Sequence, residues 1–185
     1  MSAKGAYDAY GSRKYLSRSE GRKFLRHAVR LPKAAALFCQ TIYYTGCRIS
    51  EALNLRRHDI DTELSVILIR SLKKRKKDEI RRIPVPHSLA KALVRFAWTE
   101  PDRPIWLFSR TTGWRIIKGV MKTGGISGVH ATTKGLRHGF GVRAALANIP
   151  INVIQYWMGH ADSSTTAIYL DVKDEEQRVL IRKTW

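Results

Sequence analysis

The sequence predicts a mainly α-helical fold with a small antiparallel β-sheet, which places it in the α+β class. Apolar residues recur at intervals of three and four in several segments, the spacing of amphipathic helices. Two short runs rich in branched apolar residues, at 64–70 and 80–85, are typical of strands. A strongly basic segment separates the two runs, so we expect a β-hairpin with a cationic tip.

Length and charge limit the range of functions. A chain of 185 residues is long enough for one domain with its own core. It carries 34 Lys and Arg against 15 Asp and Glu, a net charge of +19, which predicts a polyanionic partner and nucleic acid above all. On composition alone, a ribosomal or packaging protein is the alternative.

Cysteine use and hydropathy indicate the compartment. Cys39 and Cys47 have the spacing of neither a metal site nor a disulfide framework, so we expect a reducing compartment. The chain has no apolar run of about 18 residues and no leader with an apolar centre. These features predict a cytoplasmic protein without a membrane partner.

The N-terminal part predicts a tail followed by two helices. Residues 1–15 are polar, basic and contain Gly, so we expect a flexible basic tail. Ser17 and Glu20 have the spacing of a capping box, which opens a helix that stops near Pro32. The second helix follows and ends at Gly46.

Arg48 lies just beyond that helix end, and Ile49 begins another short helical segment. We therefore expect Arg48 at a corner between helices, where its side chain can reach outward. The simpler interpretation is a cation that stabilises the C-terminus of the preceding helix. Local sequence alone favours this simpler interpretation.

The middle of the chain contains the hairpin and two further helical segments. The hairpin tip, LKKRKKDE, would be costly to bury but fits a DNA groove, with a solvated surface as the alternative. Residues 86–98 have the apolar spacing of a core helix. Residues 115–122 have the spacing of a further helix, which ends at Gly124. Between them, 104–114 contain a strand-like apolar run that leads into a loop.

Residues 130–172 hold most of the candidate chemistry. His130 is a loop residue to which we assign no role. The apolar residues that follow it share one face of a helix. Lys134, Arg137 and His138 lie on or near the opposite face, which becomes cationic.

A further helix begins at Pro150 and ends at Gly159, with His160 directly after it. Asp162 is a suitable N-cap for a last short helix that carries Tyr169, nine residues beyond His160. This spacing holds Tyr169 near the basic cluster.

The motifs LRH, MGH and STTAIY, with TGCRISEALNL at 45–55, resemble the signature of the tyrosine recombinase (phage integrase) family. The resemblance covers residues from about 16 to 172 and implies that family's catalytic-domain fold over 16–185. It implies site-specific DNA recombination, in which strands are cut through a 3′-phosphotyrosyl intermediate and rejoined. This chemistry is like that of type IB topoisomerases and needs no metal or other cofactor.

The resemblance also implies roles for individual residues. The expected catalytic residues are Arg48, Lys73 or Lys74, Lys134, Arg137, His160 and the nucleophile Tyr169. The expected supporting residues are Glu51 and His138, and the expected DNA contacts are Arg70, Arg75, Lys76, Lys77, Arg81 and Arg110. Lys73 is the first choice for the general acid and Lys74 the second, with Lys76 left open.

Attack on a phosphodiester explains why these residue types are needed. A Tyr hydroxyl with an ordinary pKa of about 10 is a weak nucleophile, so the phosphorus must be strongly polarised. Arg48 and Arg137 can bind nonbridging oxygens and stabilise the transition state, and His160 can add a hydrogen bond. Lys134 stands where the family more often has His. We expect it to hold phosphate as a cation, with a general base as the alternative.

The expected partner is double-stranded DNA, bound by a homotetramer, with an accessory DNA-binding protein as a further candidate. We expect the protein in the cytoplasm at the nucleoid. We also expect that the family's usual N-terminal DNA-binding domain is missing, as in small recombinases that invert promoter segments or in an isolated catalytic domain. Two alternatives are a DNA-binding regulator with a degenerate, non-cleaving site and a non-enzymatic basic scaffold.

Overall fold

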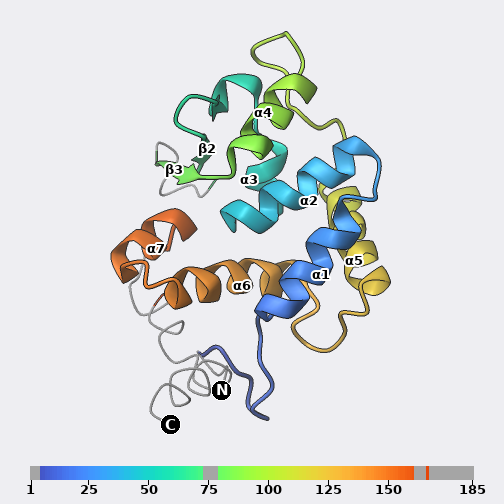
Figure 1. Cartoon of the computed structure of the whole chain (residues 1–185), viewed down its shortest axis with the longest axis vertical. Helices are drawn as coiled ribbons and strands as arrows, with labels where there is room; N and C mark the ends of the chain where they lie inside the picture. Colours follow the sequence, from blue (N-terminus) through green and yellow to red (C-terminus); the bar gives the residue numbers. More distant parts are fainter. Residues whose placement is uncertain (1–4, 73–78, 161–165, 167–185) are drawn as a thin grey trace.

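The computed structural model describes residues 5–72, 79–160 and 166, and within this part of the chain helices predominate over one small sheet (Figure 1). The helices are α1 (Arg18–Ala28), α2 (Lys33–Thr45), α3 (Ile49–Leu53), the 3₁₀ helix η1 (Arg57–Asp59), α4 (His87–Phe96), α5 (Arg110–Thr123), α6 (Thr133–Leu146) and α7 (Ile151–Met158). The strands are β1 (Ile60–Asp61), β2 (Val66–Arg70) and β3 (Ile80–Pro84). The predicted mainly helical fold with a small antiparallel sheet is confirmed. No helix in these described ranges is long and apolar enough to cross a bilayer.

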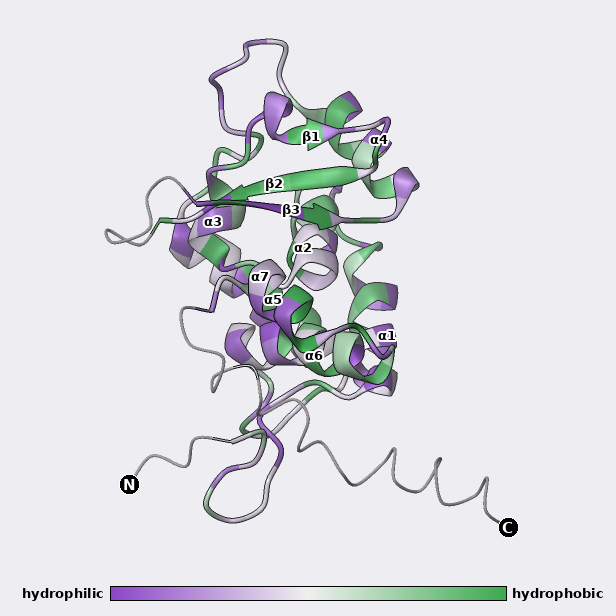
Figure 2. Cartoon of the chain, turned by 90° about the vertical axis from the view of Figure 1, so that its left-hand side faces the viewer, coloured by the Kyte–Doolittle hydropathy of each residue, from purple (hydrophilic) through white to green (hydrophobic). Residues whose placement is uncertain are grey.

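The sheet has the order β1-β2-β3, and both strand pairs are antiparallel. Ile67 pairs with Ile83 across β2 and β3, and both side chains are buried on the face that meets the helices. Figure 2 shows β2 as an almost wholly apolar strand, which agrees with its central place in the sheet. The two predicted strands are confirmed as a hairpin pair. The two-residue strand β1 is too short to give a periodic signal in the sequence.

Helix α2 occupies the centre of the molecule and packs against α1, α4, α5 and α6 (Figure 1). Its buried side chains include Phe38, whose ring meets Trp106 and Phe108 edge to face at centroid distances of 5.2 and 5.0 Å. Such aromatic pairs add to the free energy gained by burying apolar area. These contacts anchor α2, the helix whose C-terminal end leads to Arg48, in the core.

Hydrogen bonds connect α7 to the sheet. The hydroxyl of Tyr156 accepts from the backbone N–H of Arg82 at 3.0 Å and donates to the carbonyl of Ile80 at 3.3 Å. Ile154 is fully buried beneath, as its helical spacing predicts. The C-terminal end of α7 is thus fixed against β3.

The predicted helix boundaries at the capping box and at the two glycines are confirmed. The Ser17 hydroxyl accepts from the Glu20 amide at 3.3 Å, and the Glu20 carboxylate accepts from the Ser17 amide at 2.9 Å. Gly46 and Gly159 end α2 and α7 in the left-handed conformation, with φ of 62° and 58°. Each glycine is followed closely by a candidate site residue.

The segment at 104–114 differs from its prediction. It forms no strand, and α5 begins at Arg110, five residues before the predicted start. The Ser109 hydroxyl accepts from the Thr112 amide at 3.2 Å and so caps the helix. The aromatic residues before Ser109 favour a strand locally, but they are used for core packing against α2 instead.

The predicted flexible tail is corrected for residues 5–15. Tyr7 and Arg13 form an isolated antiparallel bridge, and the Tyr7 and Tyr15 hydroxyls lie 3.3 Å apart. Ala6 and Tyr15 are buried in the main core. The polar composition of this segment predicts a flexible tail, but its aromatic residues supply apolar surface. This surface packs the segment onto the domain.

Gly46 offers a test of how tightly α2 and α6 pack. A Cβ at this position would lie 2.5 Å from the Phe140 ring, and its φ is positive. We expect Gly46→Ala to lower the free energy of unfolding by about 2–4 kcal/mol, because strain in the left-handed conformation adds to overpacking.

Urea denaturation would measure this change, with Gly119→Ala as the matched control. Gly119 lies inside α5 with open space around it, so alanine there should raise the free energy of unfolding by about 0.5–1 kcal/mol. Equal effects of the two substitutions would contradict the proposed packing.

Candidate active site

Arg48 occupies the corner between α2 and α3. Its backbone is extended (φ −76°, ψ 153°), and its amide donates to Glu51 Oε2 at 2.8 Å. Its guanidinium Nη1 donates to Glu51 Oε1 at 2.9 Å, and the side chain remains 37% exposed. These hydrogen bonds run forward to α3, not back to the carbonyl groups that end α2. The geometry therefore favours an outward-reaching Arg48 over a simple helix-end cation.

Glu51 is buried and bound by two arginines. Nη2 of Arg81, on β3, lies 2.8 Å from Glu51 Oε1, a distance that fits an ion pair although the angle is poor for a hydrogen bond. Burial by itself would raise the pKa of Glu51, but Arg81, the Arg48 amide and the Arg48 guanidinium outweigh it and hold the pKa below its ordinary value. Glu51 is therefore ionised at neutral pH.

The predicted DNA contact at Arg81 is corrected by this geometry. Arg81 is fully buried, and its Nη1 donates to the Trp157 carbonyl at 2.9 Å. A Cβ at Gly159 would lie 3.1 Å from the same guanidinium, so only glycine leaves it room. Arg81 connects β3 to Glu51 and to the end of α7, and a side chain without exposed surface cannot reach a phosphate.

Arg137 joins the ends of two helices. It extends from α6, is nearly buried, and donates to the Gly46 carbonyl at 2.6 Å and to the Met158 carbonyl. Gly46 precedes Arg48 by two residues, and Met158 precedes His160 by two residues. One guanidinium therefore brings the chain segments of Arg48 and His160 together.

His160 directly follows the glycine that ends α7. Its backbone amide donates to the Gln155 carbonyl at 3.2 Å, which continues the helix-end pattern. Its Nδ1 lies 2.9 Å from the Thr166 hydroxyl. A hydrogen bond at one ring nitrogen orients the imidazole and thereby the direction of Nε2.

The first two turns of α6 carry Lys134 and His138. Thr132 caps this helix by accepting from the Gly135 amide at 2.9 Å, and Lys134 is exposed in the first turn. Burial lowers the pKa of His138 to about 4, and the charges of Lys134, Arg137 and Lys14 contribute. His138 is therefore a neutral imidazole at pH 7, able to donate through one nitrogen and accept through the other.

The chain is similar to known proteins in sequence and in fold. A family model described as the phage integrase family matches residues 14–176. The chain belongs to the phage integrase family.

Among the integrase-family relatives, the tyrosine recombinase XerA of Thermococcus onnurineus is 32% identical over 176 residues, which is 89% of this chain and 60% of the relative. A tyrosine recombinase of Pseudothermotoga lettingae is 31% identical over 177 residues, 91% of this chain and 60% of that protein. The chain thus spans about 60% of the length of these relatives.

Solved structures show the same fold. The crystal structure of XerA recombinase matches with a TM-score of 0.76 and 27% identity, covering 92% of this chain and 64% of that one. The catalytic domain of bacteriophage HP1 integrase matches with a TM-score of 0.66 and 19% identity, covering 90% of this chain and 93% of that domain. XerH recombinase bound to its difH substrate matches with a TM-score of 0.74 and 19% identity, covering 96% of this chain and 59% of XerH.

Several predicted integrase site residues lie outside the described part of the chain. They are Lys73, Lys74, Arg75, Lys76, Lys77 and Tyr169. Their assigned roles remain predictions based on the family pattern.

The other two predicted DNA contacts are exposed. Arg70 ends β2, and its Nε and Nη2 each lie 3.1 Å from Asp59 Oδ1. Arg110 is the first residue of α5, and a Cβ at Gly113, three residues later, would lie 3.4 Å from Ile49. The start of α5 therefore lies beside α3, close to the corner that holds Arg48.

Sequence reasoning missed His130. Its Nε2 lies 3.0 Å from Glu20 Oε1, and Arg13 Nη2 lies 2.7 Å from the same oxygen. Its backbone is equally constrained, because a Cβ at Gly135 would lie 1.9 Å from the His130 carbonyl oxygen. These contacts fix the loop that leads into α6. A pair separated by 110 residues leaves no local signal in one sequence.

The buried carboxylate allows a test that depends on pH. Glu51→Gln should lower the free energy of unfolding at pH 7 by about 3–5 kcal/mol, because it leaves Arg81 buried without its counter-charge. Since the folded-state pKa of Glu51 is lowered, its stabilising effect is present above its unfolded pKa of about 4.3 and is lost as pH falls through the folded value.

Guanidinium denaturation of the wild type and Glu51→Gln between pH 7 and pH 3 would measure this difference. The gap between them should narrow toward pH 3. Glu63→Gln, at an exposed position, is the control and should change stability by less than about 0.5 kcal/mol. A gap of constant size over the whole pH range would argue against an ionised Glu51.

Proposed function

We propose that this chain is the catalytic domain of a tyrosine-type site-specific recombinase, which cuts and rejoins DNA strands through a 3′-phosphotyrosyl intermediate. The observation that carries the proposal is the position of Arg137. Its contacts with the Gly46 and Met158 carbonyls bring together the chain segments that lead to Arg48 and His160. Two guanidinium groups and an imidazole carried by these adjoining segments would suit the negative charge of a phosphodiester.

In the proposed reaction, the Tyr169 oxygen attacks the scissile phosphorus and passes its proton to solvent water. A P–O bond to Tyr169 forms, and the bond from phosphorus to the 5′ oxygen breaks. Lys73 or Lys74 gives a proton to the departing 5′ oxygen, which leaves as a hydroxyl. Rejoining reverses these steps with the 5′-hydroxyl of a partner strand.

The arginines and His160 supply the positive potential for this reaction. Arg48 and Arg137 contact nonbridging oxygens and stabilise the charge of the pentacoordinate transition state. Glu51 fixes Arg48 through two hydrogen bonds, so little motion is needed when substrate arrives. The neutral imidazole of His138 supports these groups without adding repulsion between cations.

The proposed partner is double-stranded DNA in the cytoplasm, at the nucleoid. The net charge of +19 supports a polyanionic partner. We propose that a homotetramer carries out strand exchange, with an accessory DNA-binding protein where the target site requires one. XerH provides a precedent for the DNA partner, because that recombinase has been captured on its difH substrate before cleavage.

A second candidate is a DNA-binding regulator that does not cut. The observation that favours it is Lys134, which replaces the more usual family His at the start of α6. Covalent trapping on a DNA suicide substrate separates the two candidates, because only a cutting enzyme forms an adduct.

Tyr169→Phe should abolish the covalent adduct and leave noncovalent DNA binding within about twofold, because only the nucleophilic oxygen is removed. Denaturing gels with a labelled suicide duplex would measure the adduct, and a gel-shift titration would measure binding. Tyr10→Phe is the matched control, since Tyr10 is 93% exposed, and it should form the adduct at the wild-type rate. An adduct in Tyr169→Phe would assign the nucleophile to another residue.

The role of Lys134 can be decided by substitution. If it holds phosphate, Lys134→Arg should keep appreciable cleavage, Lys134→His some, and Lys134→Ala should lose roughly ten- to a thousandfold, on the order of one charge-assisted contact. Single-turnover rates on the suicide substrate would measure this series. Arg cannot act as a base, so activity that survives with His but collapses with Arg would identify Lys134 as a general base.

A further inference from the structure

Helix α1 and the residues after it carry a row of exposed cations that the proposed chemistry does not use. We call this row the α1 basic face, and it consists of Arg18, Arg22, Lys23, Arg26, Arg30 and Lys33. Arg18, Arg22 and Arg26 are four residues apart, so they lie above one another on one side of the helix. The opposite side of α1 is buried through Phe24 and Ala28, so the cations point away from the core.

Most of these charges do not stabilise the helix that bears them, although Arg26 in the last turn interacts favourably with the helix dipole. Like charges four residues apart destabilise a helix by about 0.2–0.5 kcal/mol per pair. The carboxylate within α1, Glu20, points inward to Ser17, Arg13 and His130. Within the described part of the chain, no carboxylate forms an ion pair with any member of the α1 basic face.

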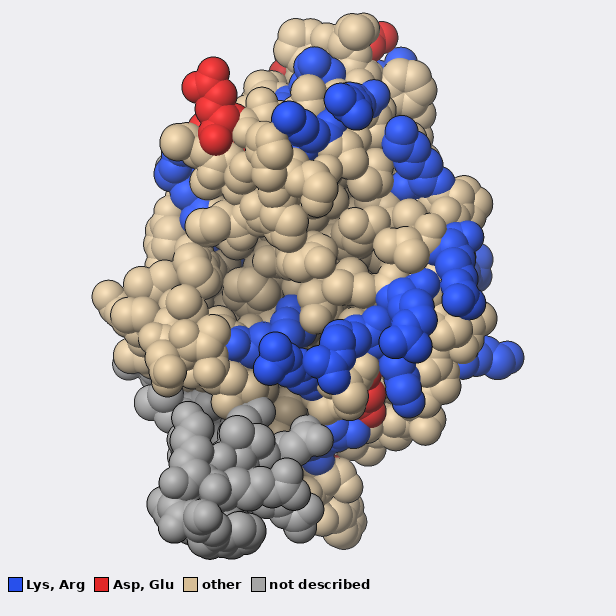
Figure 3. Space-filling view, viewed as in Figure 1, with Lys and Arg blue, Asp and Glu red and all other residues tan. Residues whose placement is uncertain are grey.

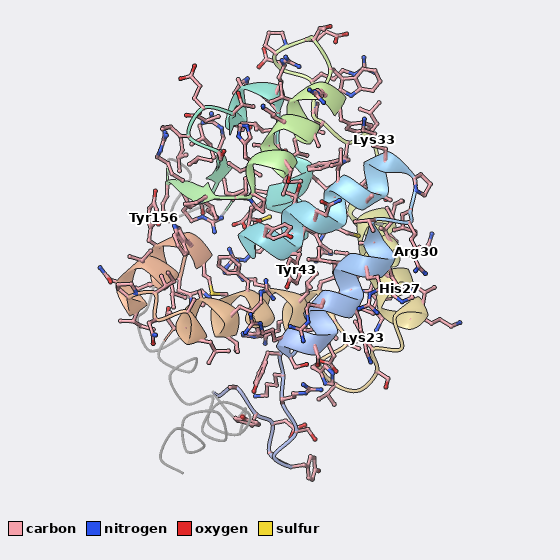
Figure 4. All side chains as sticks on the ribbon, in the orientation of Figure 1. Lys23, His27, Arg30, Lys33, Tyr43 and Tyr156 are labelled. Carbon is pink, nitrogen blue, oxygen red and sulfur yellow. The ribbon has the colours of Figure 1, made fainter. Side chains whose placement is uncertain are left out.

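The α1 basic face lies on the side of the molecule away from α3 and the corner that holds Arg48, although the start of α1 lies beside α6, where the Leu16 amide donates to the Gly135 carbonyl. In Figure 2, α1 lies at the right, whereas α3 and the end of β2 lie at the left. Figure 3, viewed from the α1 side, shows Lys and Arg side chains in a band with few Asp or Glu atoms beside them. Figure 4, in the same orientation, places Lys23, Arg30 and Lys33 along this band.

We propose that the α1 basic face binds the phosphate backbone of a second DNA duplex, while the active-site face holds the first. Arg18 to Arg26 span about 12 Å along the helix axis. Because each strand carries one phosphate per about 3.4 Å of duplex axis, a row of this length can lie beside several phosphates. The contact is independent of base sequence, because it reaches only the backbone.

Two other classes of partner fit the α1 basic face less well. A helix that binds a membrane surface must insert an apolar side into the lipid, but the apolar side of α1 is buried in the protein core. Energetically dominant residues of protein interfaces are enriched in Trp and Tyr as well as Arg, and the α1 basic face has no aromatic residue. A row of cations without such residues suits nucleic acid.

Lysine modification can detect the second duplex directly. The wild-type protein is treated with an amine-acylating reagent at about 50 mM salt, with and without a twofold excess of a random 20-base-pair duplex, and each lysine is quantified by mass spectrometry. We expect DNA to slow modification of Lys23 and Lys33 at least threefold, and to leave Lys91 on α4 unchanged. Equal protection of Lys23 and Lys91, or no DNA effect on Lys23, would overturn the proposal.

Stoichiometry gives an independent test with a matched control. Native mass spectrometry at a large excess of duplex should show two duplexes on one wild-type chain. An assembly in which several recombinase chains hold two duplexes would instead contain at least one chain for each duplex. Its mass therefore differs from that of one chain with two duplexes. Arg22→Gln with Arg26→Gln should weaken the second duplex about tenfold or more.

The control is Lys91→Gln with Arg95→Gln, a pair of exposed cations at the same spacing and helix position on α4. It should retain the second duplex. If both double variants lose it equally, the effect is one of net charge and the α1 basic face is not a site. Covalent adduct formation by the α1 variant tests the proposed chemistry separately, and we expect it at the wild-type rate on the first duplex.

Discussion

The contacts of Arg137 are the interaction on which the candidate site depends. Backbone carbonyls at the ends of two helices are ordinarily satisfied by water or by capping groups. Here one guanidinium takes that place for α2 and α7. The residues that follow those helix ends are the ones that the proposed chemistry uses. A side chain of α6 therefore determines both the packing of three helices and the position of a functional group on each side of it.

This arrangement concentrates cations, and Glu51 compensates for part of that charge. The carboxylate contacts Arg48 and Arg81, two arginines that differ greatly in exposure. Arg81 is wholly structural, whereas Arg48 retains exposed surface toward the proposed substrate. A single buried carboxylate thus makes one cation tolerable inside the core and holds another in position for a ligand. Burial is the main cause of the lowered pKa of His138, and the neighbouring positive charges contribute to it.

Local patterns predicted the helices, the hairpin and the glycine stops, because each depends on spacing within a few residues. The family resemblance implies a DNA contact at Arg81, yet strand alternation places this residue on the same face as the buried Ile83. That signal was present in the sequence and could have corrected the assignment. The early start of α5 was missed because Ser109 follows aromatic residues that favour a strand. The contact between His130 and Glu20 depends on tertiary folding, which no local pattern encodes.

The bonds between α7 and β3 have a consequence for the proposed DNA complex. Tyr156 holds the backbone of β3 at two points, and Arg81 ties the same strand to Trp157. The base of the hairpin and the helix that precedes His160 therefore move as one body. In the proposed complex with DNA, a force on β3 would reach the chain segment of His160 through α7. The proposed groove contact and the alignment of the phosphate would then be coupled, and by linkage each would favour the other to the same extent.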